Sequence, residues 1–148
     1  GKERRDSALA GVEASSGDIV LIHDGARPFV SAQLIERVID GAIAHGACIP
    51  VIHSPDTLRS LNDDDTVSSE PIDRTRIVRV QTPQGFRTDL IWGALAESRP
   101  EILDDAEAIL SMGGRVFTVP GEETNLKVTR PADLEIAEAI ASSLDVNR

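Results

Sequence analysis

The sequence predicts an α/β domain in which helices flank a mostly parallel sheet. A run of apolar residues at 19–22 ends abruptly at polar residues and is typical of a fully buried strand. Residues 34–43 carry one apolar stripe at helical spacing, and residues 48–52 form a second apolar run. A strand, a helix and a strand in this order are typical of a right-handed crossover unit with parallel strands.

Length and composition indicate one globular domain. The chain has 148 residues, of which 41% are hydrophobic and 27% are charged. Its net charge of -10 argues against binding to nucleic acid or to an anionic membrane, and no apolar run is long enough to span a bilayer. The single cysteine, Cys48, cannot form an internal disulfide, so we expect a buried thiol and a cytoplasmic protein.

The first half of the chain places further elements around this unit. Residues 4–14 have apolar residues at helical spacing and predict a short helix. Ser31 is a suitable N-cap for the next helix, which the His-Gly pair at 45–46 ends. After the second strand, residues 53–76 contain turn clusters, and we expect a protruding hairpin β-arm around the Asn-Asp turn at 62–65.

The second half predicts two more strands and three helices. Residues 77–80 form a strand, and residues 82–86 form the polar turn that ends it. The remaining expected elements are helices that begin at 88–89 and 104–105, a strand at 115–119, a returning loop at 120–129 and a last helix from Pro131.

The polar turn after the first strand carries the first candidate site residues. In an open α/β sheet, ligands bind beyond the carboxyl ends of the strands, so we expect Asp24 and Arg27 to face a ligand. A carboxylate can hold a hard cation, and a guanidinium can grip a phosphate. Gly25 lets the backbone approach closely. An aspartate at this position could also simply cap the next turn.

Several other polar residues have two interpretations. Lys127 alternates with its apolar neighbours, which suits an outward-facing strand residue as well as a phosphate ligand. The arginines at 74, 76 and 79 suit a solvated face as well as a site. The aspartates at 63–65 predict a solvated turn, because adjacent carboxylates cannot all converge on one ion.

The sequence has no zinc-ligand spacing, nucleophile elbow or P-loop, which leaves phosphate and metal chemistry as the candidates. We expect His23 and His53 to pack at strand ends and His45 to lie at a helix C-terminus, without binding a metal.

Three segments, taken in order, resemble one enzyme family. They are residues 20–29 (VLIHDGARPF), 81–86 (QTPQGF) and 125–134 (NLKVTRPADL), and residues 1–11 (GKERRDSALAG) match the family segment before them. Together they resemble the 2-C-methyl-D-erythritol 4-phosphate cytidylyltransferases of the non-mevalonate isoprenoid pathway. The resemblance implies a Rossmann-like (GT-A-like) nucleotidyltransferase fold. The HD-x-A-R-P element alone also occurs in related nucleotidyltransferases.

The resemblance also implies a reaction and a set of site residues. The phosphate of 2-C-methyl-D-erythritol 4-phosphate would attack the α-phosphorus of CTP and release pyrophosphate. Asp24 would hold the Mg²⁺ that bridges the nucleotide phosphates, and Lys127 and Arg74 would be catalytic. The residues implied to bind the methylerythritol phosphate are Arg27, Thr57, Arg74, Thr82 and Lys127, and those implied near the nucleotide are Gly1, Ser7, Asp24 and Gly25.

The resemblance further implies a homodimer. Residues at about 53–76 would form the dimerisation arm, from which Arg74 would reach the active site of the partner subunit. The family's N-terminal glycine-rich nucleotide loop is absent from these residues, so we expect residues 1–148 to be the C-terminal part of one nucleotidyltransferase domain and to be inactive alone. Lys2 departs from the family, in which an acidic residue is common. Some members continue into a cyclodiphosphate synthase domain, which the sequence leaves open.

Two alternative functions remain open at this point. Another sugar-phosphate or polyol-phosphate nucleotidyltransferase of the same fold would differ in its acceptor pocket. A non-catalytic α/β binding module would show no magnesium-dependent affinity for nucleotides.

Overall fold

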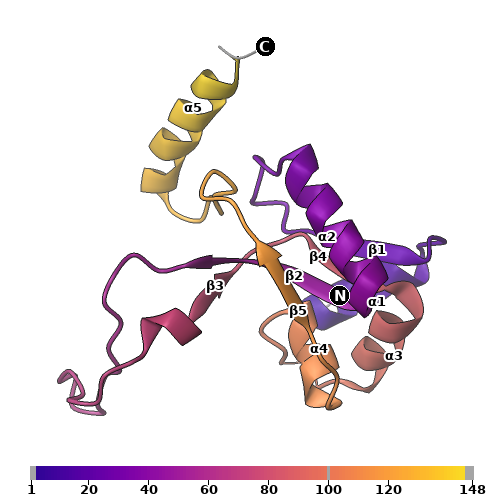
Figure 1. The fold of residues 1–148 in the computed structure, drawn as a ribbon, viewed down its shortest axis with the longest axis horizontal. Coiled ribbons are helices and arrows are strands. Elements are labelled where there is room, and N and C mark those ends of the chain that lie inside the picture. Colours follow the sequence, from indigo (N-terminus) through magenta and orange to yellow (C-terminus); the bar gives the residue numbers. More distant parts are fainter. Residues whose placement is uncertain (1–2, 100, 146–148) are drawn as a thin grey trace.

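The computed structural model describes residues 3–99 and 101–145, and Figure 1 shows the order of their elements. The predicted helices are present, with ends shifted by a few residues. The described elements are α1 (Arg4–Glu13), β1 (Ile19–Ile22), α2 (Ala32–His45), β2 (Ala47–His53), the one-turn helix η1 (Arg74–Arg76), β3 (Val78–Val80), β4 (Gln84–Arg87), α3 (Thr88–Glu97), α4 (Asp105–Ser111), β5 (Phe117–Pro120) and α5 (Pro131–Asp145).

Helix α2 illustrates how local chemistry sets the ends of an element. The Ser31 hydroxyl accepts a hydrogen bond from the backbone N–H of Leu34 at 3.0 Å, which confirms the predicted N-cap. Gly46 ends the helix with a φ of 86°, a conformation that favours glycine. Between these ends, Leu34, Val38 and Ala42 are fully buried and hold α2 against the sheet.

The sheet is mixed, and the prediction of a mostly parallel sheet is wrong. β4 pairs antiparallel with both β1 and β2, β3 pairs antiparallel with β2, and only β5 pairs parallel, with β2. β1 and β2 do run in the same direction, as the crossover pattern predicts, but β4 lies between them. Hydrophobic runs and connections indicate the direction of each strand, whereas the neighbour of a strand can come from a distant part of the chain.

The edge position of β1 explains a second difference from the prediction. All four residues of β1 are only half-buried instead of fully buried. Among the described residues, β1 pairs with β4 alone, so its other edge has no strand beside it. The predicted polar turn at 82–86 is also wrong in its second half, because β4 begins at Gln84 and pairs with β1 there.

A bulge at residues 81–83 separates β3 from β4 where both strands pair with β2. Ala47 of β2 faces Phe86, and Val51 faces Val80. Three residues lie between the two β2 positions (48–50) and five lie between their partners (81–85), so the β3–β4 side carries two extra residues. Bulges of this kind redirect side chains and are frequent next to active sites.

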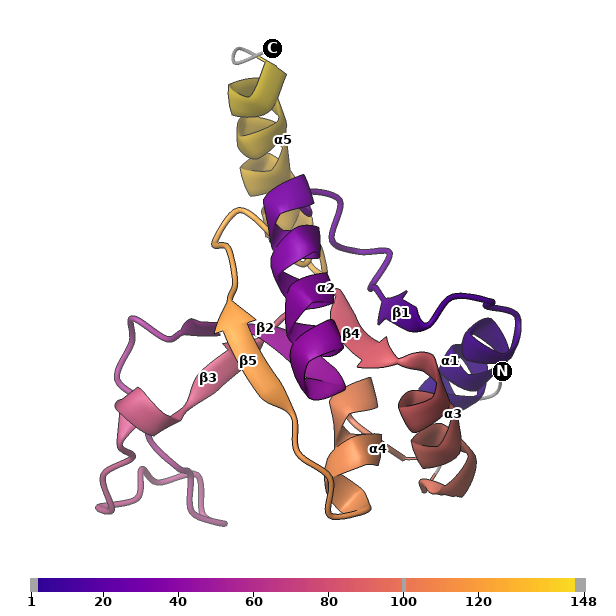
Figure 2. The same ribbon diagram turned by 45° about the vertical axis from the view of Figure 1, so that its right-hand side comes forward.

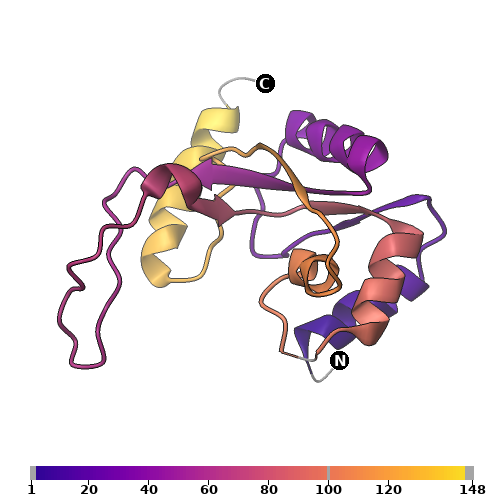
Figure 3. The same cartoon turned by 60° about the horizontal axis from the view of Figure 1, so that its bottom comes forward.

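Helices cover both faces of the sheet. α2 lies on one face, and α1, α3 and α4 gather on the other (Figure 3). Ala47 and Ile49 point into the main core with Phe86, whereas Cys48 and Gly85 point toward α2. A Cβ at Gly85 would lie 2.6 Å from the Val38 side chain, so this close approach of helix and strand requires glycine. The prediction of a buried free Cys48 is confirmed, and burial raises the pKa of its thiol.

The segment between β2 and η1 projects away from the sheet as the predicted arm (Figures 1 and 2). Its tip is a short hairpin in which Leu61 and Val67 form an antiparallel bridge. The turn at 62–65 closes the hairpin, and Asp65 has a φ of 62°. The Asp64 carboxylate accepts hydrogen bonds from Thr66 and is exposed, as expected for a solvated turn.

Helix α5 stands apart from the sheet (Figures 1 and 2). Two of its apolar residues, Leu134 and Ile136, are 55% and 51% exposed. Among the helices of the described ranges, none combines the length and the hydropathy that crossing a membrane would need.

Candidate functional site

Three segments converge at one edge of the sheet and, together with Arg4 of α1 and the two residues before α4, line a polar pocket of about 220 Å³. They are the turn after β1, the bulge between β3 and β4, and the loop after β5. Because β1 and β5 both run in the direction of β2, their carboxyl ends meet at this edge, as expected for a ligand site in an α/β sheet. The pocket is lined by Arg4, Asp24, Arg27, Val80, Gln81, Thr82, Gln84, Leu103, Asp104 and Lys127.

The Asp24 carboxylate faces two cationic side chains in this pocket. Lys127 Nζ lies 2.9 Å from Asp24 Oδ2, and Arg27 Nε lies 3.8 Å from the same oxygen. Lys127 lies in a loop and not in a strand, so its interpretation as an outward-facing strand residue is wrong. The Lys127 side chain is 47% exposed, whereas that of Arg27 is only 11% exposed. Lys127 is therefore the more accessible cation for a ligand.

Opposing effects set the protonation of these groups. Burial alone would raise the pKa of the Asp24 carboxyl, but the hydrogen bond and charge of Lys127, with the charges of Arg4 and Arg27, outweigh it, and the net pKa lies below the ordinary 3.8. Burial lowers the pKa of the Arg27 guanidinium, and the Asp24 charge counteracts this. An arginine stays protonated at neutral pH, so the pocket holds an ionised carboxylate among cations.

Hydrogen bonds hold the turn that presents Asp24. The backbone N–H of Asp24 donates to Thr82 Oγ1 at 3.0 Å, and this hydroxyl also lies 3.0 Å from His23 Nδ1. His23 Nε2 lies 3.0 Å from the Arg27 carbonyl oxygen. Thr82 and His23 thus connect the bulge to the backbone of the turn that carries Asp24.

The donor set fits Mg²⁺ only together with a ligand. No group of three or more His, Cys, Asp or Glu residues among residues 3–99 and 101–145 could hold a metal by itself. Magnesium usually binds proteins through one or two carboxylates and completes its shell with substrate phosphates and water. Asp24 offers such a carboxylate at the pocket, and Asp104 also lines it.

The structure does not bring every predicted site residue into this pocket. Thr57 and Arg74 lie in the exposed arm and η1 and do not line it, and Arg74 Nη1 donates to the Pro55 carbonyl at 2.9 Å. Ser7 is exposed on α1, and Gly25 is exposed in the turn with open space where a Cβ would lie. The predicted role of Gly1 concerns a position outside the described residues.

Arg4 is a pocket residue that sequence reasoning missed. Its guanidinium donates to both carboxylate oxygens of the fully buried Asp105, at 2.7 and 2.5 Å. Beside this pair, Gln84 donates to Asp104 and accepts from the Ala106 backbone N–H. The sequence predicts the two aspartates only as a helix start, since nothing local indicates that the partner of Asp105 lies 101 residues earlier.

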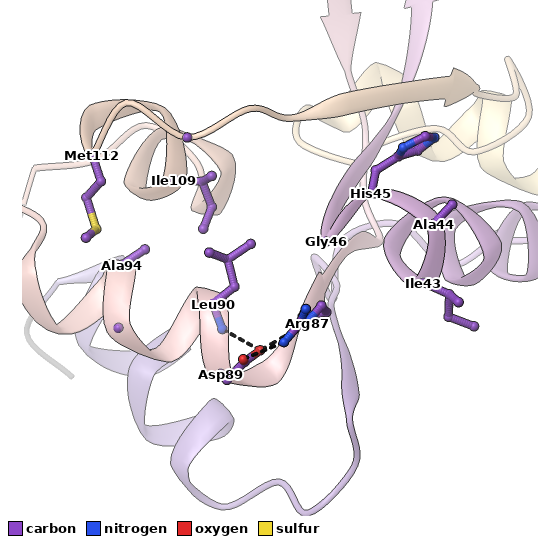
Figure 4. A pocket seen from close by; sticks show the side chains of 12 residues that line it. Ile43, Ala44, His45, Gly46, Arg87, Asp89, Leu90, Ala94, Ile109 and Met112 are labelled. Carbon is purple, nitrogen blue, oxygen red and sulfur yellow. Dashed lines mark hydrogen bonds and ion pairs between the residues drawn. The ribbon is translucent and has the colours of Figure 1, made fainter.

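A larger groove lies elsewhere and differs in character. It has a volume of about 750 Å³ and is lined mainly by residues of α2, α3 and α4, including Ile43, Leu90 and Ile109, and by Met112 just after α4. Figure 4 shows that its charged residues, Arg87 and Asp89, point toward each other. The groove is therefore mainly apolar with a neutralised ion pair, whereas the smaller pocket holds the convergent charges that phosphate chemistry needs.

Known proteins resemble the chain over nearly its whole length. A 2-C-methyl-D-erythritol 4-phosphate cytidylyltransferase from Clostridium botulinum is 41% identical over 146 residues, which are 96% of this chain and 65% of the relative. A bifunctional enzyme IspD/IspF from Solidesulfovibrio magneticus is 43% identical over 99% of this chain and 38% of its own length. The crystal structure of the 2-C-methyl-D-erythritol 4-phosphate cytidylyltransferase from Thermus thermophilus superposes with a TM-score of 0.87 at 41% identity, covering 96% of this chain and 71% of that chain.

The match to the family itself extends over residues 1–143, although the chain spans just under two thirds of the length of the curated relatives from Clostridium botulinum and Geobacillus thermodenitrificans, 65% and 64%. The chain therefore belongs to the family described as IspD, 2-C-methyl-D-erythritol 4-phosphate cytidylyltransferase.

Proposed function

We propose that this protein transfers a cytidylyl group from CTP to 2-C-methyl-D-erythritol 4-phosphate in isoprenoid precursor synthesis. One observation carries the proposal: in a chain of this family, Lys127 meets Asp24 and Arg27 in one polar pocket at the carboxyl ends of the strands. The products would be 4-diphosphocytidyl-2-C-methyl-D-erythritol and pyrophosphate.

The reaction needs positioning and charge neutralisation more than covalent catalysis. An oxygen of the acceptor phosphate forms a bond to the α-phosphorus of CTP, and the bond from that phosphorus to the bridging oxygen of pyrophosphate breaks. Lys127 donates to phosphate oxygens, and Arg27 adds a second positive charge behind it. Asp24 would hold Mg²⁺, which neutralises the charge of the nucleotide phosphates when it is bound. Thr82 keeps the Asp24 turn in place.

An assay of nucleotide and acceptor specificity tests this proposal. The intact protein is expected to release pyrophosphate with CTP, methylerythritol phosphate and Mg²⁺, and to turn over UTP and GTP at least about tenfold more slowly. A preference for another sugar phosphate or polyol phosphate would replace the proposed acceptor. The absence of any magnesium-dependent nucleotide binding in calorimetry would instead support a non-catalytic binding module.

We further propose that the arm at about 53–76 joins two subunits. The arm projects from the sheet, and its tip exposes Leu61 and Val67, which are 69% and 60% exposed. Arg74 lies at the base of the arm beside a shallow pocket lined by His53, Ser54, Pro55 and Thr75. In a symmetric dimer, each arm would carry an Arg74 to the polar pocket of the other subunit.

Mixing two inactive variants is expected to restore activity if Arg74 acts across the dimer. In a heterodimer of Arg74→Ala and Lys127→Met subunits, one of the two sites keeps both side chains. With random mixing, half of the dimers are mixed, so we expect about one quarter of the wild-type turnover. The measurement is pyrophosphate release after subunits are exchanged, and each variant alone is the control. If the mixture stays as inactive as its components, Arg74 acts within its own subunit or not at all.

A further inference from the structure

The buried amide of Gln81 connects two of the three segments that converge at the polar pocket, the bulge and the loop after β5. Gln81 Nε2 donates to the Glu122 carbonyl oxygen at 2.8 Å, and the Glu122 backbone N–H donates to Gln81 Oε1 at 3.0 Å. This pair of opposed bonds repeats the pattern between neighbouring strands and holds the loop after β5 in position and orientation. Gln81 itself is held by its backbone N–H, which donates to the Pro50 carbonyl oxygen at 2.9 Å.

A second buried side chain secures the same loop. Asn125 is fully buried, and its Nδ2 donates to the Thr82 carbonyl oxygen at 2.8 Å. The backbone carbonyl oxygen of Asn125 accepts a hydrogen bond from Arg27 Nη1 at 2.8 Å and lies 3.4 Å from Gln81 Nε2. The loop is therefore fastened to the bulge just before it presents Lys127, two residues further on.

The loop after β5 passes close to Gln81 at Gly121. A Cβ at Gly121 would lie 2.4 Å from Gln81 Oε1, so the close approach of the loop requires glycine. Gln81 is 3% exposed, and both ends of its amide are engaged by the protein. The Gln81 amide is therefore engaged by the loop that leads to Lys127.

We propose that Gln81 is a positioning residue that holds the Lys127 loop so that the ammonium group stands beside Asp24. The inference rests on the proposed function, in which Lys127 binds phosphate. The 2.9 Å contact of Lys127 with Asp24 depends on a loop that has no regular secondary structure. After Lys127 the Val128 backbone N–H donates to the Ala26 carbonyl oxygen at 2.8 Å, and before it the pair of hydrogen bonds between Gln81 and Glu122, here called the Gln81 clamp, holds the loop.

A double-mutant cycle with Lys127 tests this proposal in the intact protein. Gln81→Met keeps the side-chain volume and removes both bonds to Glu122, and we expect kcat/KM to fall about 10²-fold, the effect of displacing a reacting group by about 1 Å. In a Lys127→Met background the same change is expected to cost less than about threefold, because Gln81 acts through Lys127. Equal losses in both backgrounds would overturn the proposal, as would an unchanged kcat/KM in the single variant.

Two further variants separate positioning from general damage. Gln81→Glu keeps an acceptor for the Glu122 N–H but places a buried carboxylate oxygen against the Glu122 and Asn125 backbone carbonyl oxygens, so its loss should be at least as large as that of Gln81→Met. Arg87→Met removes an exposed ion pair with Asp89, outside the polar pocket and the loop after β5, and is expected to leave kcat/KM within about twofold of wild type. A loss in Arg87→Met as large as in Gln81→Met would show that changes unrelated to this loop also disturb the site.

Hydrogen exchange provides a readout that does not depend on catalysis. In Gln81→Met the backbone amide of Glu122 loses its acceptor, and its exchange should accelerate at least about tenfold while the α2 amides stay protected. Unchanged exchange at Glu122 would refute the clamp even if the protein were active. If the wild-type protein failed to turn over CTP, the proposed function would be wrong. The exchange of the Glu122 amide would still show whether Gln81 holds the loop.

Discussion

Replacing Asp24 with asparagine in the intact protein is expected to lower kcat/KM for CTP about 10³-fold. Asparagine has nearly the same shape, but it removes the negative charge that would hold Mg²⁺ and leaves Lys127 and Arg27 facing a neutral group. The backbone bond from residue 24 to Thr82 does not involve the carboxylate, so the fold should remain intact. The measurement is pyrophosphate release over a range of Mg²⁺ concentrations, together with thermal unfolding.

The control for Asp24 is Asp89→Asn. Asp89 is also paired with an arginine, Arg87 at 2.7 Å, but its side chain is 70% exposed and lies outside the polar pocket. We expect its turnover to stay within about twofold of wild type, since exposed ion pairs contribute little. Near-normal kinetics in Asp24→Asn, with an unchanged Mg²⁺ requirement, would remove Asp24 from the metal role.

Replacing Lys127 with methionine should have the second-largest effect, a loss of about 10²- to 10³-fold in kcat/KM. Methionine retains the length of the side chain and removes the ammonium group that would donate to phosphate. Lys127→Arg keeps the charge and should recover part of the activity. Arg130→Met, an exposed cation three residues away in the same loop, is the matched control and should stay within about twofold of wild type. Equal losses at positions 127 and 130 would contradict a specific role.

The same variant should change the acid titration of the metal-free protein. The folded-state pKa of Asp24 lies below its ordinary value, so Asp24 stabilises the fold above its unfolded pKa, and this contribution is lost as the pH falls through the folded pKa. In Lys127→Met the largest attraction on the carboxylate is gone, and burial remains. The pKa should therefore rise, and carboxyl NMR titration of Asp24 measures it. A pKa that does not move would mean that Lys127 does not act on Asp24 in solution.

The candidate site was predictable wherever neighbouring residues carry the signal. Asp24 and Arg27 follow a strand directly, and the structure places both in the polar pocket. Lys127 was ambiguous, because alternation with two apolar neighbours is compatible with a strand as well as with a loop. Its contact with Asp24 joins residues about one hundred positions apart, and no local pattern reports such a distance.

The buried polar residues also make contacts that their neighbours in the sequence do not indicate. Gln81 and Asn125 belong to segments that the family resemblance singled out, yet nothing in their sequence neighbourhood indicates that they bond to each other's loops. Arg4 and Asp105 each look like ordinary helix residues until packing buries one charge against the other. A buried charge is stable only with its partner, and the fold alone supplies that partner.

By itself, the sequence determined the helices and most of the strands, the projecting arm, the polar strand end and the family. These depend on side-chain periodicity, caps and short motifs, which act over a few residues. Only the tertiary structure decided which strands are neighbours, that β4 separates β1 from β2, and that a two-residue bulge brings Gln81 and Thr82 to the loop of Lys127. The physical reason is that strand pairing and buried hydrogen bonds join distant segments through geometry, which local residue preferences do not encode.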